Sequence, residues 1–364
     1  MTDTYALISG GGTGGHVFPA LALAEELVAR GLARDEVRFV GARRGLEATV
    51  VPAAGFAVDL LPGRGLQRGL TLHTIVANLR TAGDTVVAVV RAIRLVRRLR
   101  PRVVVGVGGY ASLPALVAAR LWRIPAVVHE ADAHPGLANR IAVRLGARPA
   151  VSLPGTALPG AVVTGNPIRP AIAAVERAPV APPLVAVVGG SLGARSVNRA
   201  ILDLYDRWRD RTDVTIHHVA GVRDYEECAT RLSALRRPGD MLIYRLVPFE
   251  EHMEVIYSEA TVMVSRSGGM TAELTAVGMP AVLVPLPGAP GDHQTANAEA
   301  LAAGGAAVVV PDAALTAARL DTELGALLAD PGRLRAMSAA ARALGRPDAT
   351  ARFADLVEEV AGGR

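Results

Sequence analysis

Twice in this sequence, a short apolar run ends in a cluster of glycines and leads into a helical pattern. Residues 6–15 read ALISGGGTGG, and residues 185–194 read VAVVGGSLGA. The runs show no alternation of polar and apolar positions, as in strands that are buried on both faces of a parallel sheet. A glycine turn between such a strand and a helix is typical of Rossmann-like folds. We therefore predict an α/β protein with two doubly wound parallel sheets.

Further apolar runs extend this pattern along the chain. Residues 165–183 contain five prolines, which suits a connector. We expect one domain over 1–164, joined by a final helix at about 346–364, and a second domain over 165–345, with the ligand in a cleft between them. The predicted strands are 5–9, 37–40, 103–107, 126–129, 162–164, 184–188, 215–219, 241–246, 262–265, 281–284 and 307–310, with helices such as 20–30 and 112–121 between them.

Composition narrows the class of protein. The 364 residues are 51% hydrophobic and 20% charged, which indicates a globular chain long enough for two domains. No apolar run reaches the roughly 18 residues of a membrane span, and the start lacks the features of a secretory signal. A single cysteine, Cys228, excludes an internal disulfide framework, so we expect a cytoplasmic protein. Aromatic residues make up 4% and no recognised binding motif is present, which argues against a nucleic-acid partner.

The basic residues are unusual, because all 39 are arginine, and the formal net charge is +5. A GC-rich genome would be the plainer explanation for the absence of lysine. The guanidinium group nevertheless binds phosphate with two parallel hydrogen bonds, and a basic chain favours anionic partners.

Two familiar signatures occur at the glycine turns. Residues 10–15 satisfy G-x-G-x-x-G, with Asp35 about 20 residues on, as in dinucleotide-binding proteins. Residues 189–193 satisfy G-x-S-x-G, the nucleophile turn of serine hydrolases, with His252 or His293 downstream. Neither class explains why both halves of the chain carry such a turn.

A glycine turn at a helix N-terminus is a site for phosphate, because its N–H groups and the helix dipole both favour an anion. Two such turns can hold a nucleoside diphosphate and a second phosphorylated substrate, as a nucleotide-sugar transferase requires. His16 follows the first turn and is well matched to taking a proton from an attacking hydroxyl near neutral pH. From spacing alone, a helix-capping role for His16 is equally consistent.

A set of seven motifs connects the sequence to a known family. In chain order they are GGTGGHVFPALALAEEL, GVGGYASLPALVAA, HEADAHPGLANR, GNPIR, GGSLGARSVN, SRSGGMTAEL and GDHQTANAEAL. With them the sequence resembles, over nearly its whole length, the MurG family of glycosyltransferases of bacterial cell-wall synthesis. The resemblance implies a GT-B fold, in which two domains face each other across a cleft.

The resemblance also implies a reaction. N-acetylglucosamine would pass, with inversion, from UDP-GlcNAc to the MurNAc 4-hydroxyl of lipid I (undecaprenyl-pyrophosphoryl-MurNAc-pentapeptide), giving lipid II for peptidoglycan. The first domain would bind lipid I and the second UDP-GlcNAc, at the cytoplasmic face of the cell membrane, where the protein would be peripheral. A UDP-sugar 2-epimerase of the same fold and a non-catalytic nucleotide-sugar-binding protein stay open as alternatives.

Roles for single residues follow from the same resemblance. His16 matches the proton acceptor, with Glu130 as a second catalytic residue. Arg169 would lie near the nucleotide-sugar, Ser191 would bind a donor phosphate, and Glu273 would hold the ribose hydroxyls. The donor-site positions are Thr13, Gly14, Gly15, Asp132, Arg169, Ser191, Gly268, Gly269, Met270, Thr271, Glu273, Gln294 and Asn297. The acceptor-site positions are Gly12, Thr13, Gly14, His16, Tyr110 and Asn139.

Several of these residues also have plainer explanations. Glu130 can simply brace the loop after its strand, Tyr110 can be a packed aromatic residue, and Arg169 can form a salt bridge in the connector. His129 ends a buried strand, and for it a structural role is the stronger expectation.

The sequence departs from the family pattern in three places. Ala131 and Asp132 replace an amide pair, which puts a charge where N–H donors are usual. The motif before Glu273 is one residue shorter, and one lost residue turns a helix by about 100°. Glu250 stands where the family usually has an apolar residue near the uracil.

The sequence also bears on two further kinds of partner, metal ions and a membrane surface. No D-x-D pair is present, so we expect no metal or other cofactor to be required, and stimulation by a divalent cation is left open. Residues 64–102 suit an anionic membrane surface, since apolar positions there are surrounded by arginines. The residue pattern by itself favours a helix whose apolar face packs on the core. Because the resemblance implies a lipid-linked acceptor, we instead expect this segment to face the membrane. The membrane-facing residues would be Leu72, Ile75, Leu79, Arg68 and Arg80.

Overall fold

The computed structural model describes residues 3–12, 14–43, 45–62, 72–132, 134–190 and 193–363, with residues 72–82 and 290 described by their backbone alone. The chain divides into two compact units, which we treat separately. Unit 1 comprises Met1–Pro170 and Asp348–Arg364, and unit 2 comprises Ala171–Pro347.

Unit 1 is built on a 7-stranded parallel sheet with the order β3-β2-β1-β4-β5-β6-β7. The strand order reverses direction along the chain between β1 and β4, and in such sheets ligands bind where the carboxyl ends of those strands meet. The strands are β1 (Ala6–Ser9), β2 (Val37–Ala42), β3 (Ala57–Leu61), β4 (Val103–Gly106), β5 (Ala126–Glu130), β6 (Arg148–Val151) and β7 (Val162–Val163).

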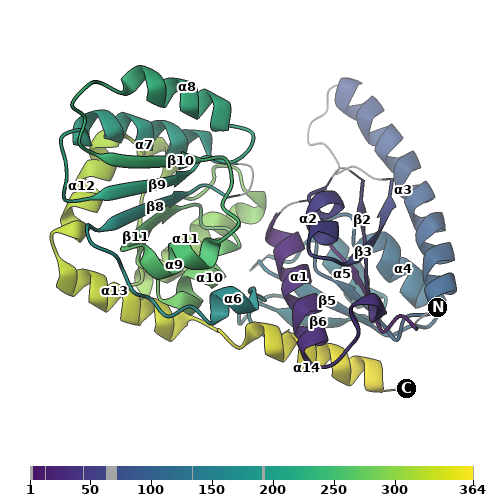
Figure 1. The fold of residues 1–364 in the computed structure, drawn as a ribbon. Coiled ribbons are helices and arrows are strands. Elements are labelled where there is room, and N and C mark those ends of the chain that lie inside the picture. Colours follow the sequence, from purple (N-terminus) through teal and green to yellow (C-terminus); the bar gives the residue numbers. More distant parts are fainter. Residues whose placement is uncertain are drawn as a thin grey trace. The chain divides into compact units, whose positions relative to one another are not determined.

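Helices cover both faces of this sheet, as Figure 1 shows. One face carries α1 (Gly14–Ala29), α2 (Glu47–Ala53) and α14 (Ala349–Gly362), and the other carries α3 (Leu72–Leu99), α4 (Leu113–Leu121) and α5 (Leu137–Arg144). Within β1, Ile8 packs with the first group and Leu7 with the second, and both are fully buried. The apolar run is therefore buried on both faces, as its lack of alternation predicts.

The last helix, α14, packs on α1 of unit 1. Arg30, directly after α1, donates hydrogen bonds to Asp355 at 2.7 Å, to Glu358 at 2.8 Å and to the Ala351 carbonyl at 2.9 Å. At the start of α14, the Thr350 hydroxyl donates to the Ile168 carbonyl at 2.7 Å and accepts from the Ile168 N–H at 3.0 Å. These contacts fasten the returning segment to the rest of unit 1.

Unit 2 repeats the plan with a 6-stranded parallel sheet in the order β10-β9-β8-β11-β12-β13. Val185 and Val187 of β8 face one core, and Ala186 and Val188 face the other. The strands are β8 (Leu184–Val188), β9 (Thr215–Val219), β10 (Ile243–Val247), β11 (Val262–Ser265), β12 (Ala281–Leu283) and β13 (Ala307–Val309).

The helices of unit 2 also form two layers. One face of the sheet carries α7 (Arg195–Trp208), α8 (Tyr225–Leu235), α12 (Ala317–Leu328) and α13 (Pro331–Leu344), and the other carries α6 (Pro170–Ala173), α9 (Met253–Glu259), α10 (Met270–Val277) and α11 (His293–Ala303). Short 3₁₀ helices occur in unit 1 at Arg34–Glu36 and in unit 2 at Pro290–Asp292 and Asp312–Ala314.

The predicted fold class is confirmed, with two parallel sheets that are each flanked by helices. The sequence does not predict β3 or β6. β3 is a partly exposed edge strand that carries Asp59, and β6 contains Arg148 and Pro149, so neither reads as an apolar run. The predicted start of the first helix is wrong, because α1 begins at Gly14 rather than at Ala20.

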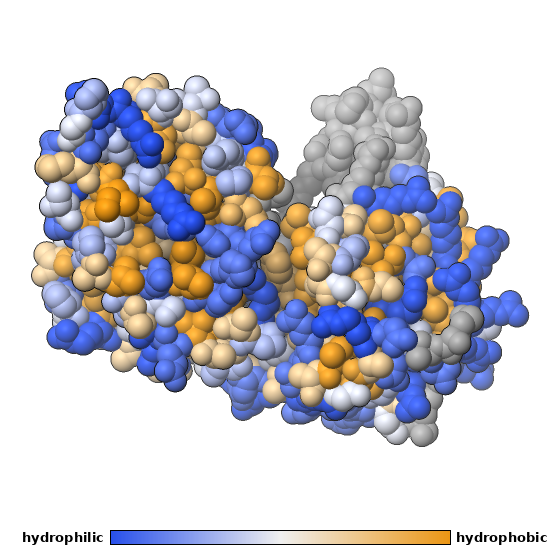
Figure 2. Space-filling model, in the orientation of Figure 1, coloured by the Kyte–Doolittle hydropathy of each residue, from blue (hydrophilic) through white to orange (hydrophobic). Residues whose placement is uncertain are grey.

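The surface is mixed in character. On the face seen in Figure 2, hydrophilic and hydrophobic residues are interspersed over both units. Among the residues that the structure describes, no helix is both long enough and apolar enough to cross a bilayer.

Candidate active site

The carboxyl ends of β1, β4 and β5 lie side by side in unit 1, because β4 pairs with both neighbours in parallel. The glycine turn at residues 10–12 follows β1, the turn at residues 107–110 follows β4, and Glu130 ends β5. Three of the motifs singled out in the sequence therefore meet at one edge of one sheet.

The two turns pack so closely that their glycines leave no room for side chains. A β-carbon at Gly10 would lie 2.2 Å from Val107 Cγ2, and one at Gly109 would lie 2.5 Å from the Gly11 carbonyl oxygen. A β-carbon at Gly108 would lie 2.7 Å from His16 Cδ2, so the second turn forms one wall of the imidazole site. These glycines serve close backbone approach as well as turn geometry.

His16 lies in the first turn of α1 and is half-buried. Its imidazole donates a hydrogen bond to the Gly11 carbonyl. Burial lowers the pKa of His16 below its usual value, and the negative charges of Asp132, Glu130 and Glu47 act in the opposite direction. The ring is therefore neutral at pH 7 and can accept a proton through its second nitrogen.

Glu130 is 6% exposed, and hydrogen bonds within its own segment occupy its carboxylate. Oε1 accepts from the Asp132 N–H at 3.1 Å, and Oε2 accepts from the Gly136 N–H at 2.8 Å and from Asn139 Nδ2 at 2.9 Å. Asn139 Nδ2 also donates to the His129 carbonyl at 2.9 Å. With these contacts Glu130 holds the segment after β5 in place. Its effect on His16 is electrostatic.

Tyr110 projects from the second turn and is 38% exposed. A β-carbon at Gly12 would lie 3.6 Å from its ring, so Tyr110 borders the first turn. Burial, and then the charge of Glu47, raise the pKa of the Tyr110 phenol. The hydroxyl therefore stays protonated near pH 7 and can donate a hydrogen bond to a ligand.

Glu47 belongs to this site, and sequence reasoning missed it. It is 1% exposed at the start of α2, where Oε2 accepts from the Gly12 N–H at 3.0 Å and Oε1 accepts from the Ala42 N–H at 2.7 Å. The Gly12 amide is thus already occupied, so a phosphate here would use the amides at the start of α1. An acidic residue in the first turn of a helix is ordinary, so nothing in the spacing of the sequence singles out Glu47.

Two further candidates from the sequence have contacts of their own in unit 1. His129 Nε2 lies 2.9 Å from the Gly165 carbonyl oxygen, and burial lowers the pKa of His129 to about 4, which fits the expected structural role. The Arg169 guanidinium lies over the ring of Phe18 of α1, 5.3 Å from its centre. Arg169 thus takes part in a cation–π contact inside unit 1.

In unit 2, the carboxyl ends of the neighbouring strands β8 and β11 carry the second set of turns. Asn297 Nδ2 donates to the Ser267 carbonyl at 3.0 Å, and the Ser267 hydroxyl donates to the Gln294 carbonyl at 2.7 Å. A β-carbon at Gly268 would lie 3.5 Å from Gln294 Nε2. Gly268, Gln294 and Asn297 therefore gather at one point. Gly269 precedes α10, Met270 begins it, and the Thr271 hydroxyl donates to the Gly268 carbonyl at 2.9 Å.

Two acidic residues of unit 2, the expected donor-site residue Glu273 and the family departure Glu250, have defined partners. Glu273 Oε2 accepts from the buried Tyr257 hydroxyl at 2.8 Å, so the shortened motif leaves this carboxylate anchored to α9. Glu250 Oε2 lies 3.2 Å from Nε2 of buried His217, which gives the unusual acid of this sequence an ion-pair partner whenever His217 is protonated. Burial lowers the pKa of His217, and Glu250 partly offsets this.

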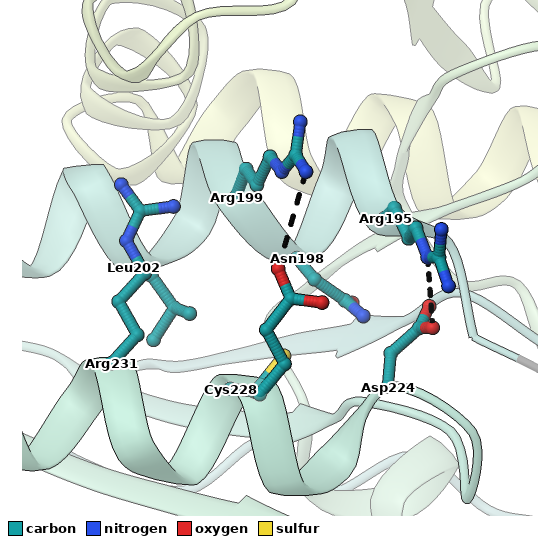
Figure 3. A pocket seen from close by; sticks show the side chains of 8 residues that line it. Arg195, Asn198, Arg199, Leu202, Asp224, Cys228 and Arg231 are labelled. Atoms are coloured by element: carbon teal, nitrogen blue, oxygen red, sulfur yellow. Dashed lines mark hydrogen bonds and ion pairs between the residues drawn. The ribbon is translucent and has the colours of Figure 1, made fainter.

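A small hollow between α7 and α8 is a poor candidate for a substrate site. Figure 3 shows Arg195 directed at Asp224, with which it forms an ion pair at 3.2 Å. Arg199 forms a second ion pair, with Glu227, at 4.0 Å. Its volume is about 10 Å³, which is close to the space of one water molecule. Its charges are largely paired and it is too small for a sugar nucleotide.

Some expectations fall where the structure gives no description. Thr13, Ser191 and Arg68 lie outside the described residues, and only the backbone is described for Leu72, Ile75, Leu79 and Arg80, which lie on α3. Within the described ranges, no three His, Cys, Asp or Glu side chains gather closely enough to hold a metal ion.

Comparison with known proteins decides the family. Residues 6–150 match the glycosyltransferase family 28 N-terminal domain, and residues 184–360 match the family 28 C-terminal domain. The crystal structure of MurG from Acinetobacter baumannii superposes with a TM-score of 0.72 at 29% identity, covering 98% of this chain and 99% of that chain. A protein from Alkalilimnicola ehrlichii is 44% identical over 364 residues, covering 98% of each chain. One from Desulforudis audaxviator is 39% identical over 374 residues, again covering 98% of each.

The chain belongs to the MurG family. Both of these relatives are named UDP-N-acetylglucosamine--N-acetylmuramyl-(pentapeptide) pyrophosphoryl-undecaprenol N-acetylglucosamine transferase. A UDP-N-acetylglucosamine 2-epimerase structure also superposes, with a TM-score of 0.65 at 16% identity, and at that distance it shares the fold alone. MurG membership accounts for the glycine turns in both halves, which neither the dinucleotide-binding nor the hydrolase signature explains.

Proposed function

We propose that this protein is an inverting glycosyltransferase that moves N-acetylglucosamine from UDP-GlcNAc to the MurNAc 4-hydroxyl of lipid I. The observation that carries the proposal is the full-length similarity, at 39–44% identity, to relatives named for that transfer. The site in unit 1 supports it, because a neutral imidazole lies beside two glycine turns and three carboxylates.

In the proposed reaction, His16 accepts the proton of the acceptor hydroxyl as its oxygen attacks the anomeric carbon. The new oxygen–carbon bond forms on one face of the sugar while the bond to the UDP oxygen breaks on the other, which inverts the configuration. The imidazolium that results is stabilised by the charges of Asp132 and Glu130. The proton later leaves His16 to solvent, and UDP departs as the second product.

Each unit is assigned one substrate in this proposal. Unit 1 binds lipid I, with its diphosphate at the amides that begin α1 and the Tyr110 hydroxyl nearby. Unit 2 binds UDP-GlcNAc at the turns after β8 and β11, with Gln294 and Asn297 toward the sugar and Glu273 toward the ribose. Backbone amides and arginine, rather than a metal, would stabilise the leaving diphosphate.

We also propose that unit 1 rests on an anionic membrane, where the lipid-linked acceptor is found. The outer face of α3 carries the exposed apolar residues Val86, Val87 and Val90, and the exposed Arg91 and Arg94 follow on the same helix. Apolar groups beside arginines suit a surface of anionic lipid.

The deciding experiment is transfer of radiolabelled sugar from UDP-GlcNAc to a soluble lipid I analogue. We expect labelled disaccharide product, and release of UDP only when the acceptor is present. Interconversion of UDP-GlcNAc and UDP-ManNAc without acceptor would instead identify an epimerase. UDP binding with neither reaction would identify a binding protein.

A further inference from the structure

One peptide group in the first glycine turn is hydrogen-bonded at both of its polar atoms. Its N–H, which belongs to Gly12, donates to Glu47 Oε2 at 3.0 Å. Its carbonyl, which belongs to Gly11, accepts a hydrogen bond from the His16 imidazole. A peptide group is planar and rigid, so Glu47 and His16 are connected through a single flat amide.

The carboxylate at the far end of this connection is held in place. Its other oxygen, Oε1, accepts from the Ala42 N–H at 2.7 Å. Three glycines enclose the side chain, since β-carbons at Gly11, Gly41 and Gly45 would lie 2.0, 2.3 and 2.0 Å from Glu47 atoms. Glycine at these three positions therefore leaves the space that the buried Glu47 carboxylate occupies beneath the turn.

We propose that Glu47 is a positioning residue for His16, which orients the imidazole and strengthens its hydrogen bond to Gly11 through the Gly11–Gly12 peptide. The inference rests on the proposed function, in which His16 accepts the proton of the acceptor. A carboxylate that accepts the N–H of an amide polarises that amide, and its carbonyl becomes a better acceptor. Hydrolases orient a histidine by direct contact with a carboxylate, and here a peptide group would stand between the two.

The connection has a chemical consequence for the proton transfer. When one ring nitrogen donates to Gly11, the other carries the lone pair, so the hydrogen bond selects the tautomer that can act as a base. The negative charges of Asp132, just after β5, and of Glu130, at its end, favour the protonated ring, and the charge of Glu47 adds a smaller effect in the same direction. Nearby His129 carries no charge at neutral pH, because burial lowers its pKa to about 4 and the charge of His16 acts in the same direction. Of these groups, Glu47 is the one joined to the ring through the turn.

The test is Glu47→Gln, measured on the full-length protein. Both carboxylate oxygens accept N–H groups, and a carboxamide can accept only one of them. In protein labelled with 15N-histidine, we expect the His16 signals, assigned by their loss in His16→Ala, to show a lower pKa and a mixture of neutral tautomers. We expect kcat/KM with UDP-GlcNAc and the lipid I analogue to fall about 10- to 100-fold, with the acid limb of its pH profile moved to lower pH.

A control variant and a double variant separate this role from a merely structural one. Glu359→Gln removes the same charge from an exposed position on α14 and should leave every readout unchanged. In a His16→Ala background, Glu47→Gln should cost almost nothing further, because its effect passes through the imidazole. A structural role predicts the same fold-loss in both backgrounds, with the acid limb and the His16 spectrum unmoved, and that result would overturn the proposal.

Two further outcomes are covered. If the Gln variant does not fold, Glu47→Asp keeps the charge but withdraws the oxygen from the Gly12 N–H. It should still lose the single tautomer, and an unchanged 15N spectrum would refute the connection. If His16→Ala retains full transfer, the proton acceptor of the proposed function is wrong, while the 15N titration still decides whether Glu47 controls the state of His16.

Discussion

Replacing Glu130 by alanine is predicted to loosen unit 1 as well as to slow catalysis. The carboxylate holds the Asp132 and Gly136 amides and Asn139 Nδ2, which tie the end of β5 to the loop and to α5. Asn139 is 2% exposed, so its amide would be left without that partner in the interior. A buried donor that loses its partner costs about 1–3 kcal/mol. The other two amides lie in a more exposed segment where water can replace part of the loss, so we expect about 2–3 kcal/mol in total.

Glu130→Gln sharpens this prediction. Its carbonyl can replace Oε2, which accepts two of the hydrogen bonds, while its amide nitrogen would face the Asp132 N–H as a second donor. We expect this variant to lose only about 1 kcal/mol. Removal of the charge also lowers the pKa of His16, because the Glu130 carboxylate favours the protonated ring. The acid limb of the rate profile should therefore move to lower pH in both variants.

The assay uses the two tryptophans of the chain, Trp122 in unit 1 and Trp208 in unit 2. In a Trp208→Phe background, urea unfolding followed by fluorescence reports on unit 1 alone, and hydrogen exchange of residues 131–144 reports on the braced segment. Glu359→Ala, an exposed change on α14, should stay within about 0.5 kcal/mol of the parent. If Glu130→Ala leaves unfolding and exchange unchanged yet abolishes transfer, Glu130 acts on the substrate directly and the bracing role is refuted.

Four other predictions follow from the contacts described above. His16→Ala should lower kcat by about 10²- to 10⁴-fold while UDP affinity, measured by calorimetry, stays the same. Because burial lowers the pKa of His16, the parent rate should decline only as the pH falls below about 6.5, and an acid limb centred above pH 7 would contradict the assignment. Arg30→Ala should weaken the attachment of α14 without releasing it, at a cost of about 1 kcal/mol that shrinks in high salt, because Asp355 and Glu358 are partly exposed to solvent, and a salt-independent loss would point to packing instead. Changing Val86, Val87 and Val90 to serine should reduce sedimentation with anionic liposomes, and unchanged sedimentation would remove this face from the membrane proposal.

Much of the fold could be predicted because its signals are local. The apolar runs that precede Gly10 and Gly189 indicate buried strands, and the glycines mark the turns after them. β3 and β6 were missed because an edge strand with Asp59 and a strand with Pro149 do not carry that signal. Their place in the sheet depends on pairing with neighbours rather than on their own composition.

The candidate site was predictable in part. His16, Tyr110 and Glu130 come from different motifs, and the parallel order of β1, β4 and β5 brings their turns to one edge. The motifs could not reveal that Glu130 is occupied by its own segment, because three hydrogen bonds define that role and sequence spacing does not. Nor could they reveal that Glu273 is anchored to Tyr257, which lies on another helix.

The class of fold, the repeated turn and the family can all be inferred from the sequence, because residues close together along the chain carry each of these signals. Which groups meet at His16 depends instead on how distant segments pack. Glu47 is 35 residues from Gly12, and it reaches that turn because β1 and β2 pair in parallel and bring the start of α2 beneath it. Periodicity reports on a residue's immediate neighbours, whereas the partner of a buried charge is set by the packing of distant segments.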